Sequence, residues 1–188
     1  MPTKTVPDFE ALYCIDPDPW NYLLSGYERD KYAVTLHACG PGPFGCALEL
    51  GGSIGVFSAM LAPRCKRLLT VDVAPTAVTR ARNRLAQFPQ AEALVAVIPD
   101  QIPDEPFDLV IASEILCYLT DEELARTVAV LRRTVVPGGR IVAVNWRPTG
   151  PDRPQDAEQA HAPLRAAPWL TRVLTGGTDD YLLEVFER

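Results

Sequence analysis

Residues 49–55 read Glu-Leu-Gly-Gly-Ser-Ile-Gly and join one apolar stretch, Cys46–Leu50, to a second, Val56–Leu61. The first stretch is short and continuous, which favours a strand buried in a parallel sheet, and the glycines that follow favour a turn into a helix. In a doubly wound sheet, this turn faces the crevice in which ligands bind. We therefore expect Gly51 to permit the tight turn and Gly55 to let a ligand lie close to the backbone.

The alternation of strand and helix continues along the chain. Further strands are expected at 67–71, 91–98, 107–112 and 140–145, and helices at 27–38, 56–61, 76–85, 121–135 and 156–162, the last ended by Pro163. The final residues predict two strands around a turn that contains glycine. The fold class is therefore α/β: a doubly wound, mostly parallel sheet with a C-terminal antiparallel hairpin. We expect one domain, in which residues 1–42 form an irregular, aromatic-rich lid with one helix and residues 43–188 form the core.

Composition excludes several classes of protein. The chain has 188 residues, of which 47% are hydrophobic and 22% are charged, and its net charge is −6. No basic stripe indicates a nucleic-acid partner, and no apolar run is long enough to span a membrane. Five cysteines without a CxxC pair, two histidines and no visible secretory signal favour a cytoplasmic protein without a metal site.

The glycine turn differs from two common nucleotide-binding motifs. A P-loop needs Lys followed by Ser or Thr after its last glycine, and the chain has Val56 after Gly55. A dinucleotide fingerprint counted from Gly51 would need glycines where Ser53 and Val56 stand. Asp72 ends the next strand, 23 residues after Glu49. A carboxylate there either caps the following helix or accepts hydrogen bonds from both ribose hydroxyls of an adenosine.

The remaining pattern, E-x-G-x-x-x-G, resembles the first motif of methyltransferases that use S-adenosylmethionine. The resemblance becomes more specific in Asp16-Pro-Asp-Pro-Trp20, in the segment from Ser25 to Tyr32, and in FDLVIASEILCYL at 107–119. These stretches are similar to the nodulation protein S family, small methyltransferases that methylate the amino nitrogen of a chitooligosaccharide. The similarity runs from Asp16 to about Arg147.

The resemblance implies a cofactor site for S-adenosylmethionine. Its cationic methionine end tolerates a nearby carboxylate such as Glu49, and Gly51, Ser53 and Gly55 would line that end. Asp72 and Val73 would hold the ribose, Trp20 would cover the cofactor with an aromatic face, and Lys31 would bind the methionyl carboxylate. Ser113 faces the same crevice. Related sequences often hold the adenine with an acid where this chain has Val97, so that contact would fall to the backbone of Val97 and Ile98, or to Asp100 or Gln101.

The methyl acceptor has fewer signals. Glu114 follows a buried strand at the crevice, where it would act as the base for an amine, although a solvated or capping role fits equally. His161 is a second candidate near the expected substrate loops, and Tyr118 and Trp146 either line the acceptor pocket or belong to the core. We expect this pocket to be built from the N-terminal segment, residues 114–119 and the loop after Arg147, which favours a small-molecule acceptor.

Two other functions fit the same sequence. One is methylation of a hydroxyl group on a small molecule. The other is a protein that binds S-adenosylmethionine without catalysis, which the missing adenine acid allows. The sequence leaves the oligomeric state open.

Overall fold

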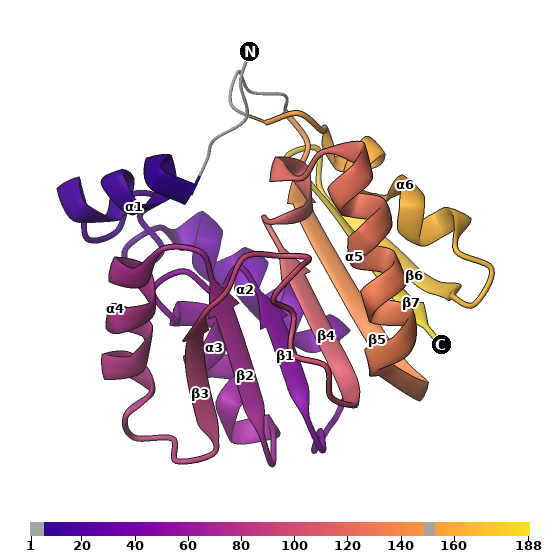
Figure 1. Ribbon diagram of the computed structural model, residues 1–188, viewed down its shortest axis with the longest axis horizontal. Coiled ribbons are helices and arrows are strands. Elements are labelled where there is room, and N and C mark those ends of the chain that lie inside the picture. Colours follow the sequence, from indigo (N-terminus) through magenta and orange to yellow (C-terminus); the bar gives the residue numbers. More distant parts are fainter. Residues whose placement is uncertain (1–5, 149–152) are drawn as a thin grey trace.

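The computed structural model describes residues 6–148 and 153–188, so part of the loop expected after Arg147 lies outside the described residues. Its centre is a seven-stranded sheet in the order β3-β2-β1-β4-β5-β7-β6 (Figure 1). The strands are β1 (Ala47–Leu50), β2 (Leu68–Asp72), β3 (Ala91–Val95), β4 (Phe107–Ser113), β5 (Val135–Trp146), β6 (Thr171–Gly177) and β7 (Tyr181–Glu187). The first five are parallel, and β7 pairs antiparallel with both β5 and β6. The predicted fold class is confirmed.

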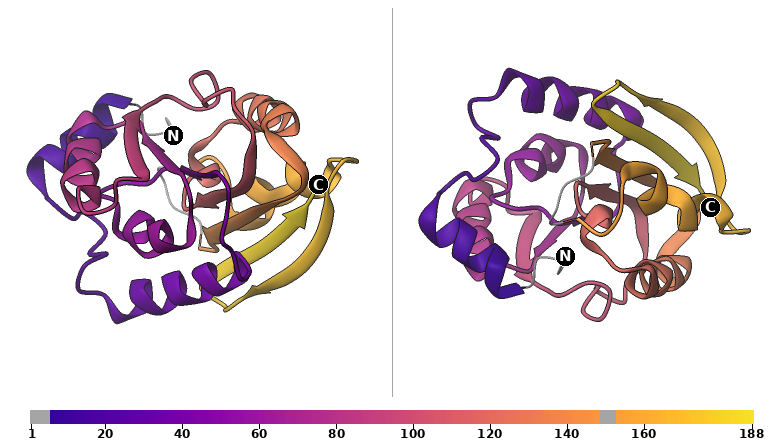
Figure 2. Two further views of the ribbon diagram at one scale, coloured as in Figure 1. Left: turned by 90° about the horizontal axis from the view of Figure 1, so that it is seen from below. Right: turned by 90° about the horizontal axis from the view of Figure 1, so that it is seen from above.

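Helices cover both faces of the sheet. They are α1 (Val6–Ile15), α2 (Gly26–Ala38), α3 (Val56–Leu61), α4 (Pro75–Leu85), α5 (Asp121–Thr134) and α6 (Ala157–Ala166), with short 3-10 turns η1 (Ala62–Arg64) and η2 (Leu116–Tyr118). Figure 2 looks along the strands and shows α2 and α3 on one face and α5 on the other. The expected boundaries of α3 and α5 agree with the structure to within one residue.

The alternation of side chains along each central strand forms two cores. On β4, Leu109 and Ile111 pack with residues of α2 and α3, whereas Val110 and Ala112 pack with residues of α5 and α6. All four are at most 1% exposed. A strand that is buried on both faces reads as a continuous apolar run, which is why FDLVIA was recognisable as a strand.

The N-terminal segment is more regular than expected. Residues 6–15 form α1, where the sequence analysis placed irregular chain. The helix is attached to α4, because Glu10 accepts hydrogen bonds from the Thr76 backbone and side chain and Arg80 donates to the Tyr13 carbonyl at 2.8 Å. Phe9 and Tyr13 are four residues apart, so they lie on one face of this helix. This spacing was the feature of the sequence from which the helix could have been predicted.

The helix near the C-terminus is longer than expected. α6 begins after the N-cap Asp156, as predicted, but it continues through Pro163 to Ala166. A proline inside a helix removes the hydrogen bond to the carbonyl four residues earlier. That carbonyl belongs to Gln159, which is exposed to solvent. Water can therefore replace the missing donor.

No helix within residues 6–148 or 153–188 combines the length and the apolar character that crossing a membrane requires. Within the same ranges, no cluster of three or more His, Cys, Asp or Glu side chains is arranged to hold a metal ion.

Candidate active site

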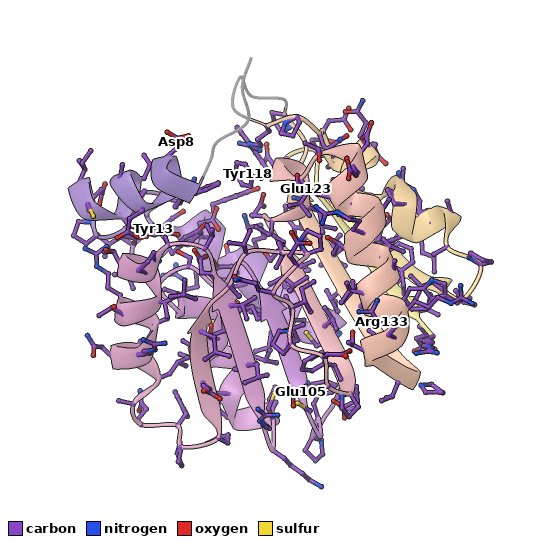
Figure 3. The ribbon with its side chains drawn as sticks, in the orientation of Figure 1. Asp8, Tyr13, Glu105, Tyr118, Glu123 and Arg133 are labelled. Atoms are coloured by element: carbon purple, nitrogen blue, oxygen red, sulfur yellow. The ribbon has the colours of Figure 1, made fainter. Side chains whose placement is uncertain are left out.

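A cavity of about 640 Å³ lies at the carboxyl ends of the parallel strands. Its walls come from α1, the segment between α1 and α2, α2 itself, and the turns that follow β1, β2, β3, β4 and β5. Figure 3 shows Tyr13, Tyr118 and Glu123 around this end of the sheet and Glu105 at the opposite end. Carboxyl ends of neighbouring parallel strands meet at one edge, so the topology brings these turns together.

The glycine turn after β1 is built on left-handed backbone. Gly51 and Ser53 have φ of 73° and 52°, and the N–H groups of Gly51 and Gly52 both donate to the Val71 carbonyl. The Ser53 N–H donates to Asp72 Oδ2 at 2.8 Å, and the Ala74 N–H donates to Asp72 Oδ1 at 3.0 Å. The turn after β1 and the end of β2 are thus tied together at the cavity wall.

Asp72 keeps free hydrogen-bonding capacity toward the cavity that it lines. Each of its carboxylate oxygens accepts one backbone N–H, and a carboxylate has about four acceptor sites in total. Burial raises the pKa of Asp72, and the backbone donors of Ala74 and Ser53 oppose that shift. Asp72 therefore binds the backbone just before α4, whose N-cap is Ala74, and its role toward a ribose stays a prediction.

Gly52 is the glycine of this turn that has no room for a side chain. A Cβ built on it would lie 1.7 Å from Thr70 Oγ1 and 3.2 Å from Glu49 Oε2. Because Thr70 is only 2% exposed, its hydroxyl has little space to move. We expect Gly52→Ala to lower the free energy of unfolding by roughly 1–3 kcal/mol through overpacking. Urea denaturation at constant pH measures this loss.

The matched control for Gly52→Ala removes the obstacle. In a Thr70→Ala background, the added methyl group no longer meets a hydroxyl, so the cost of Gly52→Ala should fall to less than half. An equal cost in both backgrounds would contradict the proposed clash.

Gly55 has a different role from the one predicted. It is the N-cap of α3 with φ of 78°, and a Cβ there would lie 3.0 Å from Ala81 Cα. It is absent from the residues that line the cavity. The close approach that requires glycine is therefore to α4 and not to a ligand.

Glu49 also lies outside the cavity lining. It is 3% exposed and accepts a hydrogen bond from the Ser58 hydroxyl of α3. This contact joins β1 to α3, the two elements that the glycine turn connects. Leu48 and Leu50 face the α5 side of the sheet, and side chains alternate along a strand, so Glu49 must face α3. Burial raises the pKa of Glu49 to about 7, and the Ser58 hydroxyl opposes the shift.

The raised pKa of Glu49 predicts a pH dependence of stability. The folded protein retains the proton of Glu49 to a higher pH than the unfolded chain, whose value is near 4.5. Stability from this group is therefore complete below about pH 4.5 and decreases as the pH rises toward 7. Between about pH 4.5 and 7, the free energy of unfolding of the wild type should fall by on the order of 3 kcal/mol relative to that of Glu49→Gln. Denaturant titrations at several pH values measure the difference, and parallel profiles for the two proteins would refute it.

Aromatic side chains of the N-terminal segment lie beside the glycine turn, and the predicted contact of Trp20 with the cofactor stays a prediction. Tyr13 Oη donates to Ser53 Oγ at 2.5 Å, and the Trp20 ring lies 5.5 Å from the Tyr13 ring and 6.1 Å from that of Tyr22. Burial raises the pKa of Tyr13, so it stays a neutral hydrogen-bond donor. Tyr13, Trp20 and Tyr22 all line the cavity.

Lys31 joins two carboxylates at the cavity wall. Its Nζ lies 3.0 Å from Glu28 Oε2 and 2.8 Å from Glu114 Oε1, and the lysine side chain is 3% exposed. The two carboxylates raise the pKa of Lys31 against the effect of burial, so the ammonium is charged. Two of the three N–H donors of Lys31 therefore bind Glu28 and Glu114, and the third remains for the predicted contact with the methionyl carboxylate.

Glu114 stands at the cavity in an unusual conformation. It directly follows β4 with φ of 56°, and its Oε2 accepts the Trp146 N–H at 2.9 Å. The prediction that Glu114 reaches the crevice agrees with the structure, because it lines the cavity with Ser113 and Trp146. Lys31 and the backbone of β5 fix the position of its carboxylate.

The predicted adenine contacts lie at the cavity, with one change. Val97 and Ile98 line it, as does Val73, which was predicted for the ribose, whereas Asp100 and Gln101 do not. The Val97 N–H already donates to Gln101 Oε1 at 2.8 Å, so it is not free for a ligand. Gln101 thus acts by shaping the loop after β3.

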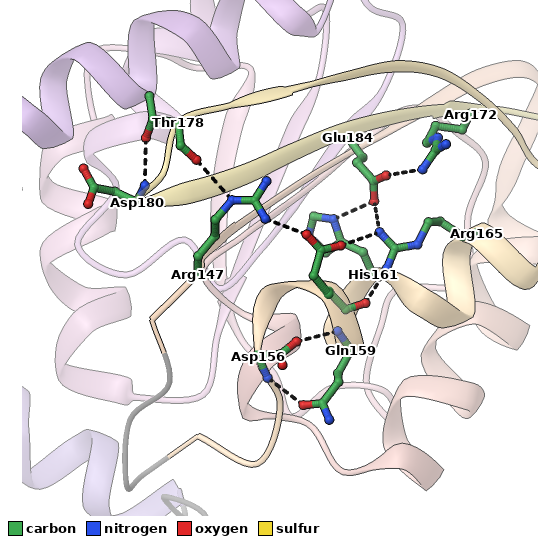
Figure 4. Close-up of polar contacts among 10 residues, drawn as sticks. Arg147, Asp156, Gln159, His161, Arg165, Arg172, Thr178, Asp180 and Glu184 are labelled. Carbon is green, nitrogen blue, oxygen red and sulfur yellow. Dashed lines mark hydrogen bonds and ion pairs between the residues drawn. The ribbon is translucent and has the colours of Figure 1, made fainter.

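The prediction that His161 lies near the substrate is wrong. It is 0% exposed on the buried face of α6, where Nδ1 lies 3.0 Å from Glu184 Oε2 (Figure 4). Its Nε2 lies 3.1 Å from Asn145 Oδ1. Glu184 also pairs with Arg165 and Arg172. These side chains pack α6 against β5 and β7, and none of them lines the cavity.

Several cavity residues were not proposed from the sequence as ligand-binding residues. Among them are Phe9, Tyr13, Tyr22, Tyr27, Glu28, Glu123 and Arg153. Most of these come from the N-terminal segment. Its aromatic residues were visible in the sequence, but the sequence did not show which of their side chains face the cavity.

Comparison with known proteins agrees with this geometry. The sequence profile of the family described as "Nodulation protein S (NodS)" matches residues 13–142. The Nodulation protein S of Rhizobium tropici is 36% identical over 127 residues, which cover 66% of this chain and 53% of that protein. The chain belongs to the nodulation protein S family. It spans about half the length of the curated relatives that it matches.

Solved structures of similar proteins extend the likeness over the whole chain. A structure of the N-methyltransferase NodS from Bradyrhizobium japonicum WM9, in complex with S-adenosyl-L-homocysteine, has a TM-score of 0.85 at 26% identity and covers 98% of each chain. A structure described as a putative methyltransferase from Pseudomonas syringae has a TM-score of 0.77 at 34% identity and covers 87% of this chain and 100% of its own. These solved structures therefore have the same fold as this chain, and one of them belongs to the family that the sequence match indicates.

Proposed function

We propose that this protein transfers a methyl group from S-adenosylmethionine to the amino nitrogen of a small molecule. The observation that carries the proposal is the junction of the glycine turn with Asp72. A partly buried carboxylate with free acceptor sites lies beside a left-handed backbone turn, next to the aromatic side chains of Tyr13 and Trp20. Family membership and the ligand named in the similar N-methyltransferase structure support the same reading. We also propose that residues 1–188 form one domain.

The residues present fit this cofactor. Asp72 would accept hydrogen bonds from the ribose hydroxyls, Val73 and Ile98 offer apolar surface for the adenine, and Gly51 and Ser53 would line the methionine end. Trp20 presents an aromatic face that attracts a sulfonium. When bound, the cofactor would supply an activated methyl group.

The acceptor side of the cavity is suited to a cation. Apart from Asp72, which the cofactor would occupy, the charged lining of the cavity consists of Glu28, Glu114 and Glu123 against Lys31 and Arg153, which leaves an excess of one carboxylate. An alkylammonium is protonated at neutral pH and must lose a proton before nitrogen can accept a methyl group. We propose that Glu114 orients this amino group and accepts its proton, because its oxygens keep acceptor sites beyond those used by Lys31 and Trp146.

Calorimetry with S-adenosylhomocysteine tests the cofactor, and labelled S-adenosylmethionine with a panel of amino sugars and small amines tests the transfer. We expect saturable binding and label on nitrogen, located by NMR. Absence of binding would refute the proposal. Label on oxygen would identify a hydroxyl methyltransferase instead, and binding without any turnover would identify a non-catalytic protein.

A further inference from the structure

Arg153 is a cavity residue that the proposed reaction leaves without a role. Its guanidinium carbon lies 4.5 Å from the centre of the Trp146 ring. Its Nε is buried and has no hydrogen-bond partner in the described part of the chain. By contrast, Arg147, Arg165 and Arg172 each pair with a carboxylate. A buried donor without a partner costs free energy, so this position favours a ligand that supplies the acceptor.

Arg153 is held from two sides. The guanidinium carbon lies over the ring of Trp146. Gln155, two residues later, is anchored to the turn after β4 and to α5. The Gln155 N–H donates to the Cys117 carbonyl at 3.3 Å, and Gln155 Nε2 donates to Asp121 Oδ1 at 2.7 Å. The guanidinium therefore belongs to the wall of the cavity and is oriented before a ligand arrives.

The chemistry of this group selects an oxyanion. A guanidinium presents parallel N–H donors that match the two oxygens of a carboxylate or a phosphate. The other cation of the cavity, Lys31, is already paired with Glu28 and Glu114. Among the described residues, an incoming anion therefore meets a guanidinium without an ion-pair partner at Arg153 and an ammonium already paired with two carboxylates at Lys31.

We propose that Arg153 binds an oxyanion of the methyl acceptor, and that the preferred acceptors are amines that also carry a carboxylate or a phosphate. The inference rests on the proposed function, in which Glu114 receives the amino group. Trp146 connects the two positions, because its backbone N–H binds Glu114 and its ring lies under the guanidinium carbon of Arg153. One end of the acceptor would lie at the carboxylate and the other at the guanidinium.

Three acceptors on one sugar frame test this proposal: glucosamine, glucosamine 6-phosphate and 2-amino-2-deoxyglucuronic acid. Their binding to the protein saturated with S-adenosylhomocysteine is measured by calorimetry, and their methylation with S-adenosylmethionine gives kcat/KM. We expect at least one anionic sugar to exceed glucosamine by about tenfold or more, and Arg153→Gln to abolish that preference. The phosphate and carboxylate arms show which oxyanion the site accepts.

The controls separate this role from a structural one. Arg153→Lys keeps the charge without the planar fork and should retain part of the preference. Arg67→Gln removes an exposed arginine that pairs with Glu105, far from the cavity, and should leave the preference unchanged. A structural defect in Arg153→Gln would weaken the binding of all three sugars equally and leave their ratios unchanged.

The proposal is overturned if Arg153→Gln leaves the ratio between anionic and neutral sugars unchanged. It is also overturned if neither anionic sugar binds to the protein that holds S-adenosylhomocysteine. Failure of S-adenosylhomocysteine itself to bind would refute the proposed function, which is a distinct result.

Discussion

Glu114→Gln should lower kcat for methylation of an amine by about 10² to 10⁴, the usual range for loss of a positioned acid or base. The substitution keeps the size of the side chain but removes the charge that orients the amino group and the site that takes its proton. Binding of S-adenosylhomocysteine should change little, because we propose that its ribose and methionine contacts are made by Asp72 and by the glycine turn.

Steady-state kinetics with labelled S-adenosylmethionine measure the effect of Glu114→Gln, and calorimetry checks the cofactor site. Glu105→Gln is the matched control, since Glu105 also pairs with a basic side chain but lies at the opposite end of the sheet. A Glu114→Gln enzyme with normal kcat would eliminate the proposed role of this carboxylate.

Asp72→Asn should weaken binding of S-adenosylhomocysteine by roughly 10- to 100-fold. Hydrogen bonds to a charged group contribute about 1.5–3 kcal/mol, and the amide offers one acceptor oxygen where the carboxylate offers two. The loss should appear in Kd for both the cofactor and its product, because both contain the same ribose.

Asp108 supplies a matched control for Asp72. It lies on β4, where its two oxygens accept the backbone N–H groups of Gly45 and Cys46 at 2.5 and 3.0 Å, but it does not line the cavity. Asp108→Asn should therefore reproduce the structural cost of Asp72→Asn without its effect on binding. Equal affinities in the two variants and the wild type would exclude Asp72 from the cofactor site.

The sequence predicted those features that depend on local pattern. The apolar runs of the buried strands, the Thr120–Glu123 capping box of α5 and the proline at the start of α4 each specify an element through neighbouring residues. Ser53 and Asp72 were predictable for a related reason, because in a parallel sheet the chain after each strand arrives at one shared edge.

The remaining features depend on contacts between distant segments. Side-chain alternation along β1 predicts that Glu49 and Leu50 point to opposite faces of the sheet. Only the position of α3 shows that the Ser58 hydroxyl donates a hydrogen bond to Glu49. His161 was placed near the expected substrate loops because its helix follows the fifth strand. Its partner Glu184 and the arginines that pair with Glu184, Arg165 and Arg172, come from three separate elements. No local pattern reports such a cluster.

The strand order separates the two tasks of the cavity. The chain at the ends of β1 and β2 carries the residues assigned to the nucleoside, whereas the chain at the ends of β4 and β5 carries Glu114 and Trp146. Selectivity toward acceptors can therefore diverge through changes at the second pair of strand ends while the first pair stays intact. For an engineer, this makes the right half of the sheet in Figure 1 the region to diversify in a library.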